Sequence, residues 1–142
     1  MASLAYNIAL EKADTAGLGL VANRVDAMCI VGTATTPDNP DHDFVADIVA
    51  DEATDASYAR VILTTKVGTR NDTLDRHELD FDNIDYGALT GETVTAIVLF
   101  RFVTNDADSF LLSYHDISDT ITDGTGFVVV VGSTGGIHIT SV

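Results

Sequence analysis

The stretch Val94-Thr95-Ala96-Ile97-Val98-Leu99-Phe100-Arg101-Phe102 decides the fold class, because apolar residues recur in it at every second position. Side chains of a β-strand alternate between the two faces of a sheet. One face of this segment then carries Val94, Ala96, Val98, Phe100 and Phe102, while Thr95 and Arg101 lie on the other. We therefore expect a central strand that packs one face against a hydrophobic core.

Further runs with strand-like patterns flank this segment and are separated by turns rich in Asp, Gly, Thr and Asn. About seven strands at such spacing predict an all-β fold, either a sandwich or a barrel. The other expected strands are Val25–Gly32, Tyr58–Lys66, His77–Asp82, Phe110–His115, Phe127–Val131 and Ile137–Thr140. The expected turns are Gly68–Asp75, Asn105–Asp108, Thr122–Gly124 and Gly132–Gly136.

The alternation also predicts which side chains form the core. In the Tyr58–Lys66 strand, Ala59, Val61 and Leu63 face inward, and Arg60, Thr64 and Lys66 face outward. The run Phe127–Val131 is continuously apolar, which indicates a strand covered on both faces. The expected core residues are Val61, Leu63, Phe81, Val98, Phe100 and Val128.

Two segments have helical spacing. Ser3–Ala16 is the only candidate for a long helix, with Ser3 as its cap and Gly17 after its end. Its apolar stripe is weak, so residues 1–19 form either this helix or an arm that orders on contact with a partner. Phe44, Val45, Ile48 and Val49 predict one or two helical turns near residues 43–50, after an exposed loop at Thr35–Asp43.

The length of 142 residues suits one β-rich domain, 1–142, of which residues 1–19 are the helix or arm. No apolar run approaches the ~18 to 20 residues that span a bilayer. The N-terminus has neither a basic region nor a continuous apolar run, so we expect no signal peptide and synthesis in a cytoplasm.

The net charge of −15 comes from 22 acidic and 7 basic residues, and 18 of the acidic residues are Asp. Nucleic-acid binding relies on Lys and Arg, and anionic membranes repel such a surface, so we expect neither partner. Asp favours turns over helices, in keeping with a β-rich chain. The charge favours solubility, or alternatively a source in salty water, where salt screens self-repulsion.

No combination of residues in the sequence indicates catalysis or a cofactor. The single cysteine, Cys29, lies in an apolar run and is expected in the core. Four histidines are scattered without metal-ligand spacing, and Gly132–Gly136 matches neither a nucleophile elbow nor a phosphate loop. We therefore expect no enzymatic activity, no metal and no cofactor.

Three acidic pairs keep one alternative open. Asp41 and Asp43, Asp80 and Asp82, and Asp106 and Asp108 each place two carboxylates on one side of an extended segment. Ca²⁺ prefers clusters of oxygen ligands, although none of the pairs matches the calcium-loop motif. The pairs predict a solvated acidic face, with a calcium site as the alternative.

The order of segments resembles that of small structural proteins of tailed bacteriophages, over about residues 20–140. The segments that carry the resemblance are Val25–Val31, His42-Asp43-Phe44-Val45-Ala46-Asp47-Ile48, Ala56–Leu63, Leu79-Asp80-Phe81-Asp82, Asp85–Gly91 before the central strand, and Gly136–Thr140. It implies a virion protein, a capsid decoration (cement) protein on the outside of a phage head. Its implied partners are the major capsid protein and further copies of itself, as a trimer by analogy.

Other functions remain open beside this one. They are a tail or head–tail connector component, a non-catalytic β-sandwich binding module (adhesin-like, carbohydrate- or calcium-binding), and an enzyme of unrecognised type. For a self-associating protein, the candidate interface residues are Leu4, Tyr6, Ile8 and Leu10, because they form no convincing core-facing stripe and a partner could cover them.

Overall fold

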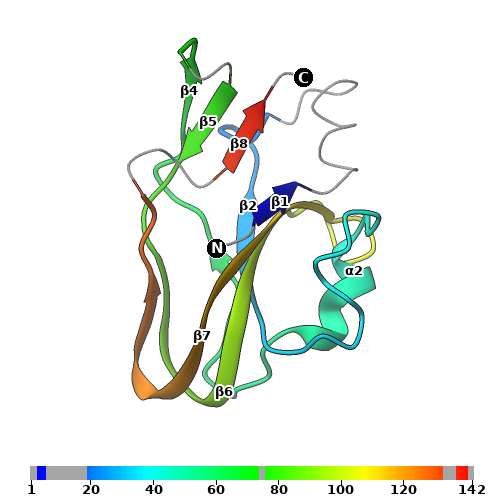
Figure 1. The fold of residues 1–142 in the computed structure, drawn as a ribbon, viewed down its shortest axis with the longest axis vertical. Helices are drawn as coiled ribbons and strands as arrows, with labels where there is room; N and C mark the ends of the chain where they lie inside the picture. The colour runs from blue at the N-terminus through cyan, green and yellow to red at the C-terminus, as the bar shows by residue number, and fades with distance from the viewer. Residues whose placement is uncertain (1–2, 6–18, 74–75, 133–136, 141–142) are drawn as a thin grey trace.

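The regular structure of the described residues is almost wholly β (Figure 1). The computed structural model describes residues 3–5, 19–73, 76–132 and 137–140. A helical turn, α2 (Val45–Ile48), continues into a 3-10 turn, η1 (Val49–Asp51). The mostly β class and the short helix near residues 43–50 are thus confirmed. The strands are β1 (Ser3–Ala5), β2 (Val25–Ile30), β3 (Val61–Ile62), β4 (Val67–Asn71), β5 (Arg76–Asp80), β6 (Ile84–Arg101), β7 (Phe110–Val129) and β8 (Ile137–Thr140).

The strands form two sheets in which every pair is antiparallel. The larger sheet has the order β1-β7-β6-β2-β3, and the smaller has the order β4-β5-β8 and lies at one end of the molecule (Figure 1). Over the described residues the strands number eight, where about seven were expected, and neither sheet is closed. A sandwich or barrel therefore stays a prediction.

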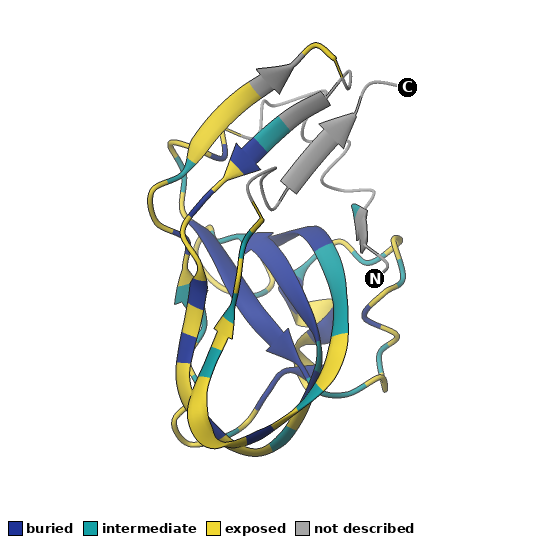
Figure 2. Cartoon of the chain, turned by 60° about the vertical axis from the view of Figure 1, so that its left-hand side comes forward, coloured by how far each residue is buried: buried dark blue, intermediate teal, exposed yellow. Residues whose placement is uncertain are grey.

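The long strands β6 and β7 form a ribbon that bends back on itself (Figures 1 and 2). Cys29 of β2 pairs with Ile97 of β6, yet it also lies beside Tyr86, eleven residues earlier in β6. A straight strand would separate those β6 residues by about 36 Å. The bend coincides with register shifts between Asp85 and Thr93 and with positive φ angles at Gly87, Gly91 and Gly124, as expected of β-bulges.

The core lies around β2 and the second half of β6. All six residues of β2 are buried, and so are the residues from Ala96 to Phe100 (Figure 2). The central strand therefore packs both faces, because Ile97 and Leu99 are buried as well as the predicted face. Free Cys29 is fully buried among them, as the sequence predicted.

Four of the predicted core residues, Leu63, Phe81, Val98 and Phe100, are buried. Val61 is only partly buried. Val128 is 45% exposed, and Val130 is 76% exposed, so the prediction of a strand covered on both faces at Phe127–Val131 was wrong. This apolar run is at the end of the bent ribbon, where Phe127 packs against the core and its neighbours alternate outward.

Several expected boundaries were also wrong. Ser3–Ala5 form a strand instead of the start of a helix, because they pair with β7; residues 6–16 of that helix lie outside the description. Within Tyr58–Lys66 only Val61–Ile62 are strand, and Ala59 is exposed.

Two of the expected turns are strands instead. Val67–Asn71 pair with β5, and Thr122–Gly124 lie inside β7. A glycine bulge within a ribbon has the composition of a turn.

Candidate functional site

The structure places the predicted interface residues only in part. Tyr6, Ile8 and Leu10 lie outside the described residues. Leu4 is in β1, directly opposite Tyr114 of β7, with Ser3 opposite His115 and Ala5 opposite Ser113. The described part of the proposed arm is thus an outer strand, which joins the larger sheet by backbone pairing.

Beyond this ladder, β7 presents what we call the β7 edge, residues Asp116–Val129. On one side these residues pair with β6 from Ala96 back to Ile84. On the other side no strand of the described chain pairs with them. The edge carries the exposed apolar side chains Ile121 and Val128, and it also carries Asp116, Asp119 and Asp123. Acidic residues and bulges at a sheet edge oppose indiscriminate pairing.

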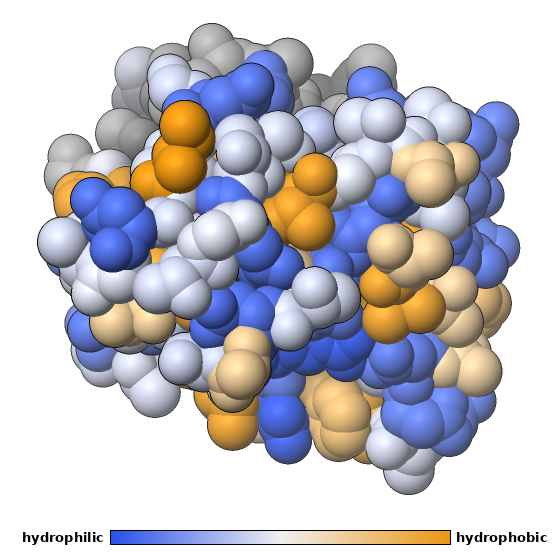
Figure 3. Space-filling model, turned by 90° about the horizontal axis from the view of Figure 1, so that it is seen from below, coloured by the Kyte–Doolittle hydropathy of each residue, from blue (hydrophilic) through white to orange (hydrophobic). Residues whose placement is uncertain are grey.

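The exposed apolar side chains do not gather into one patch on the face seen from below (Figure 3). They stand apart on it, separated by hydrophilic ones. Apolar residues that are exposed singly are normal on a protein surface. This face therefore has no apolar docking site, and the sheet edge is the better candidate for an interaction surface.

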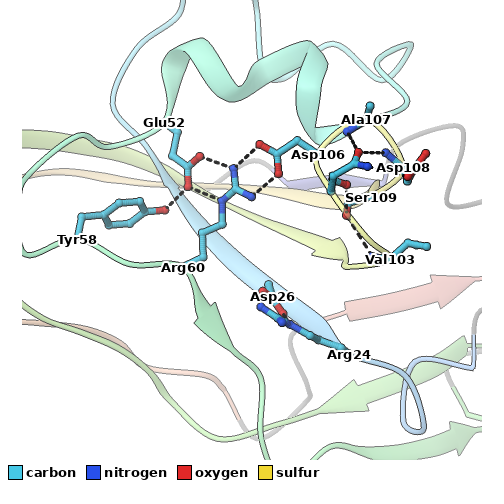
Figure 4. A network of polar contacts seen from close by, with 11 residues as sticks. Arg24, Asp26, Glu52, Tyr58, Arg60, Val103, Asp106, Ala107, Asp108 and Ser109 are labelled. Carbon is cyan, nitrogen blue, oxygen red and sulfur yellow. Dashed lines mark hydrogen bonds and ion pairs between the residues drawn. The ribbon is translucent and has the colours of Figure 1, made fainter.

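One polar cluster is centred on Arg60, which lies between two carboxylates (Figure 4). Its Nε donates to Glu52 Oε1 at 2.7 Å and its Nη2 to Glu52 Oε2 at 2.6 Å. Nη1 and Nη2 donate to the two oxygens of Asp106 at 2.6 and 3.0 Å. Tyr58 completes this Arg60 cluster, since its hydroxyl donates to Glu52 at 2.7 Å and accepts from the Cys29 N–H at 3.0 Å.

The Arg60 cluster shifts the pKa of Arg60, Asp106 and Tyr58. Hydrogen bonds to Glu52, together with those to Asp106, raise the pKa of Arg60 despite its burial. The hydrogen bond from Arg60 lowers the pKa of Asp106. Burial, followed by the Glu52 charge, raises the pKa of Tyr58 and keeps it neutral. The cluster therefore joins the segment after η1, β2 and the loop between β6 and β7 through ion pairs and hydrogen bonds.

Strand alternation does not predict this cluster, because it assigns Arg60 to the outward face of the Tyr58–Lys66 segment. In fact the Arg60 side chain is only 22% exposed, and its guanidinium lies 5.2 Å from the centre of the Phe100 ring. The composition does indicate that an arginine will be paired. The chain has 22 acidic and only seven basic residues, so each arginine has many possible carboxylate partners. The identity of those partners depends on the fold.

A second carboxylate, Asp51, shapes the loop after β2. It accepts hydrogen bonds from the Ala34 and Thr35 N–H groups at 2.8 and 2.7 Å. Burial raises its pKa, but the hydrogen bonds from Thr35 and Ala34 outweigh that effect and the pKa is lowered. Gly32 packs so closely that an added Cβ would lie 2.3 Å from Asp51 Oδ1. Asp51 thus serves the loop structure.

The bend of the ribbon has its own polar contacts. Glu92 Oε1 accepts hydrogen bonds from the N–H groups of Thr54 and Asp55 at 2.6 and 3.1 Å. Asp55 in return accepts from the N–H and hydroxyl of Thr90, at 3.1 and 2.7 Å. The Thr122 hydroxyl, buried within β7, donates to the Glu92 carbonyl at 3.1 Å. These contacts fasten the bulged part of β6 to the segment after η1.

In two of the three acidic pairs the carboxylates make structural contacts. Asp106 binds Arg60, whereas Asp108 accepts from Thr104 and Asn105. Asp82 accepts from the hydroxyls of Thr64 and Thr65. In the part of the chain that the structure describes, no group of three or more His, Cys, Asp or Glu side chains is placed to hold a metal ion.

The remaining candidates for chemistry are also structural. Burial raises the pKa of Cys29 to about 12, so its thiol is protonated at neutral pH and a poor nucleophile. His42 Nε2 donates to the Thr35 carbonyl at 2.7 Å, and His115 Nε2 lies 2.8 Å from Ser113 Oγ. The side chains of His77 and His138 are outside the description.

Comparison with models of known protein families finds no match, and no curated protein matches the chain closely enough to count as a relative. Within the described residues, no helix is both long and apolar enough to cross a membrane.

Proposed function

We propose that this chain is a virion structural protein, and specifically a decoration protein that binds the outside of a phage capsid and stabilises it. The phage assignment rests on the order of segments described above. The β7 edge and the charged contacts support a structural role independently of that order. A decoration protein requires a stable fold, a soluble exterior and a surface that binds further copies or a shell protein.

The observation that carries the proposal is the β7 edge. A sheet edge offers rows of backbone N–H and C=O groups, which bind an added strand from another chain. In this chain β1 already uses three residues of that strand, and Asp116–Val129 continue past it without a paired strand among the described residues. Such an edge suits a protein that is built into an assembly.

Two further features support a structural role. The charged side chains described above hold loops against the sheet: Arg60 joins three segments, and Asp51 and Glu92 each fasten a loop. In addition, the net charge of −15 keeps free copies apart in dilute solution. Specific backbone contacts would then decide where the copies meet.

The test is the composition of purified particles. Tailed-phage particles released by the organism that carries this gene are analysed by mass spectrometry and by electron microscopy with gold-labelled antibody. We expect the chain as a high-copy component, with label on the heads. Label confined to tails would replace decoration by a tail or connector role. Absence from the particles would overturn the virion assignment.

A further inference from the structure

We propose that β1 is exchanged between copies of this chain, so that Ser3–Ala5 of one copy pairs with Ser113–His115 of a second copy. The register is the one that the structure has within a single chain. This inference rests on the proposed function, because it names the contact by which neighbouring copies are joined.

β1 is peripheral to the fold. It is the outermost strand of the larger sheet and pairs with β7 alone, over three residues. The buried apolar residues that the structure describes begin at Leu20 and end at Leu112. On its other side, β7 is held along most of its length by β6. The buried apolar residues given for the core thus come from Leu20–Leu112, and the strand pairing of β1 is confined to one short ladder.

The chain between β1 and the core is long enough for exchange. Residues 6–18 separate Ala5 from Gly19, and an extended chain of that length spans at most about 45 Å. A domain of 142 residues has a radius of gyration of about 14 Å. The covalent connection thus permits β1 to reach the β7 strand of an adjacent copy.

Exchange of β1 also limits the Coulomb repulsion between two acidic chains. The exchanged ladder contains the same backbone hydrogen bonds as the closed one, so the two forms differ little in contact energy and concentration decides between them. At −15 per chain, interfaces based on broad contact between acidic surfaces are opposed by Coulomb repulsion. A narrow ladder at a sheet edge brings little charged surface together, and a capsid lattice supplies the high local concentration.

The experiment uses two full-length variants, Leu4→Cys and Tyr114→Cys, which alter residues that lie directly opposite each other. Opposed residues of antiparallel strands have Cα atoms about 4.5 to 5.5 Å apart, within the range of about 4.4 to 6.8 Å that a disulfide bridges. The variants are mixed at high protein concentration and high salt, one of them labelled with ¹⁵N, and oxidised. Because each chain carries only one introduced thiol, a disulfide between the unlike chains forms either by exchange of β1 or by random collision, and the control below measures the collisional yield. The native Cys29 thiol is buried and does not compete.

The matched control is Leu4→Cys mixed with Val103→Cys, since Val103 is 47% exposed and has no place in the β1 ladder. Intact-mass spectrometry without reductant counts the mixed-label dimers. We expect several-fold more of them for the ladder pair than for the control. Equal yields from the two mixtures would overturn the exchange.

A second pair, Ser3→Cys with His115→Cys, guards against loss of fold at Tyr114, because it samples the same ladder one residue away. The double variant Leu4→Cys/Tyr114→Cys completes the test: if it forms only intrachain disulfides at every concentration, β1 stays within its own chain and the proposal is wrong. That failure leaves the virion assignment intact, which depends on the composition of the particles. Conversely, a chain that exchanges β1 but is missing from particles would refute the virion assignment alone.

Discussion

Tyr58 and Tyr86 stack with their ring centres 6.0 Å apart and their planes 21° from parallel. Tyr86 also stacks on Phe127 at 5.8 Å, so three rings join the segment after η1 to both strands of the bent ribbon. The two tyrosine hydroxyls differ. That of Tyr58 makes two hydrogen bonds, whereas that of Tyr86 is buried beside the Cys29 thiol and has no nitrogen or oxygen partner in the described structure.

The first prediction contrasts these hydroxyls. We expect Tyr58→Phe to lower the free energy of unfolding by about 1 to 3 kcal/mol, because it removes the acceptor of the buried Cys29 N–H and one of the hydrogen bonds to Glu52. We expect Tyr86→Phe to be neutral or slightly stabilising. Urea unfolding followed by circular dichroism measures both. A larger loss for Tyr86→Phe than for Tyr58→Phe would contradict the assigned roles.

The second prediction concerns the Arg60 cluster. Arg60→Ala removes the guanidinium that is paired with Glu52, whose side chain is only 10% exposed. Breaking a buried ion pair costs about 3 to 5 kcal/mol, and we expect about 2 to 3 here since Arg60 keeps some contact with solvent. Arg60→Lys keeps the positive charge but not the planar set of guanidinium donors, so it should lower the free energy of unfolding by less than Arg60→Ala does. Equal losses for the two variants, measured by urea unfolding, would refute a role for the planar set of donors.

The third prediction is a pH dependence. The hydrogen bond from Arg60 holds the pKa of Asp106 below its unfolded value, which is about 3.9. Its ionised form therefore stabilises the fold fully above pH ~4, and this contribution is lost as the pH falls through the lowered folded pKa. Asp106→Asn should be less stable than the parent protein at pH 7, and the difference should shrink as the pH falls below about 4. Thermal melts from pH 7 to 2.5 measure it; a constant difference would count against the ion pair.

The fourth prediction tests the bend of the ribbon. Gly91 has φ +75° with open space around its Cβ position, so Gly91→Ala incurs only backbone strain, about 1 to 2 kcal/mol. Gly126 lies in the same ribbon with equally open space but without a positive φ, so Gly126→Ala is the control and should change stability by no more than about 1 kcal/mol, in the favourable direction. Urea unfolding measures both free energies. Equal losses of stability for the two variants would show that the positive φ at Gly91 does not require glycine.

The fifth prediction is that self-association strengthens as ionic strength rises, because salt screens the repulsion between chains of net charge −15. Light scattering at low and high salt measures it. Removal of residues 1–10 should abolish the association if the N-terminal segment carries it. A monomer at every salt concentration would refute self-association, and association that weakens with salt would indicate an interface based on opposite charges.

The alternation at Val94–Phe102 was enough to predict a strand, because the period of apolar residues is a local property of the chain. The burial of Ile97 and Leu99 on its other face came from the tertiary structure. The buried helical turn at Val45 and Ile48 and the core position of Cys29 followed from local pattern, as this strand did. The turn composition at Thr122–Gly124 was misleading, since the glycine that would end a strand also permits a bulge within one.

The tertiary structure alone decided which distant residues meet. The sequence pattern predicts that Arg60 faces outward from a strand. In the structure Arg60 binds Glu52 and Asp106, and Asp106 is 46 residues away in the chain. Tyr86 reaches Cys29 only because the ribbon bends, and Ser3–Ala5 become a strand only because β7 offers its edge. Hydrophobic alternation fixes the face of a strand but not its neighbours, which depend on register, bulges and the pairing of charges across the whole chain.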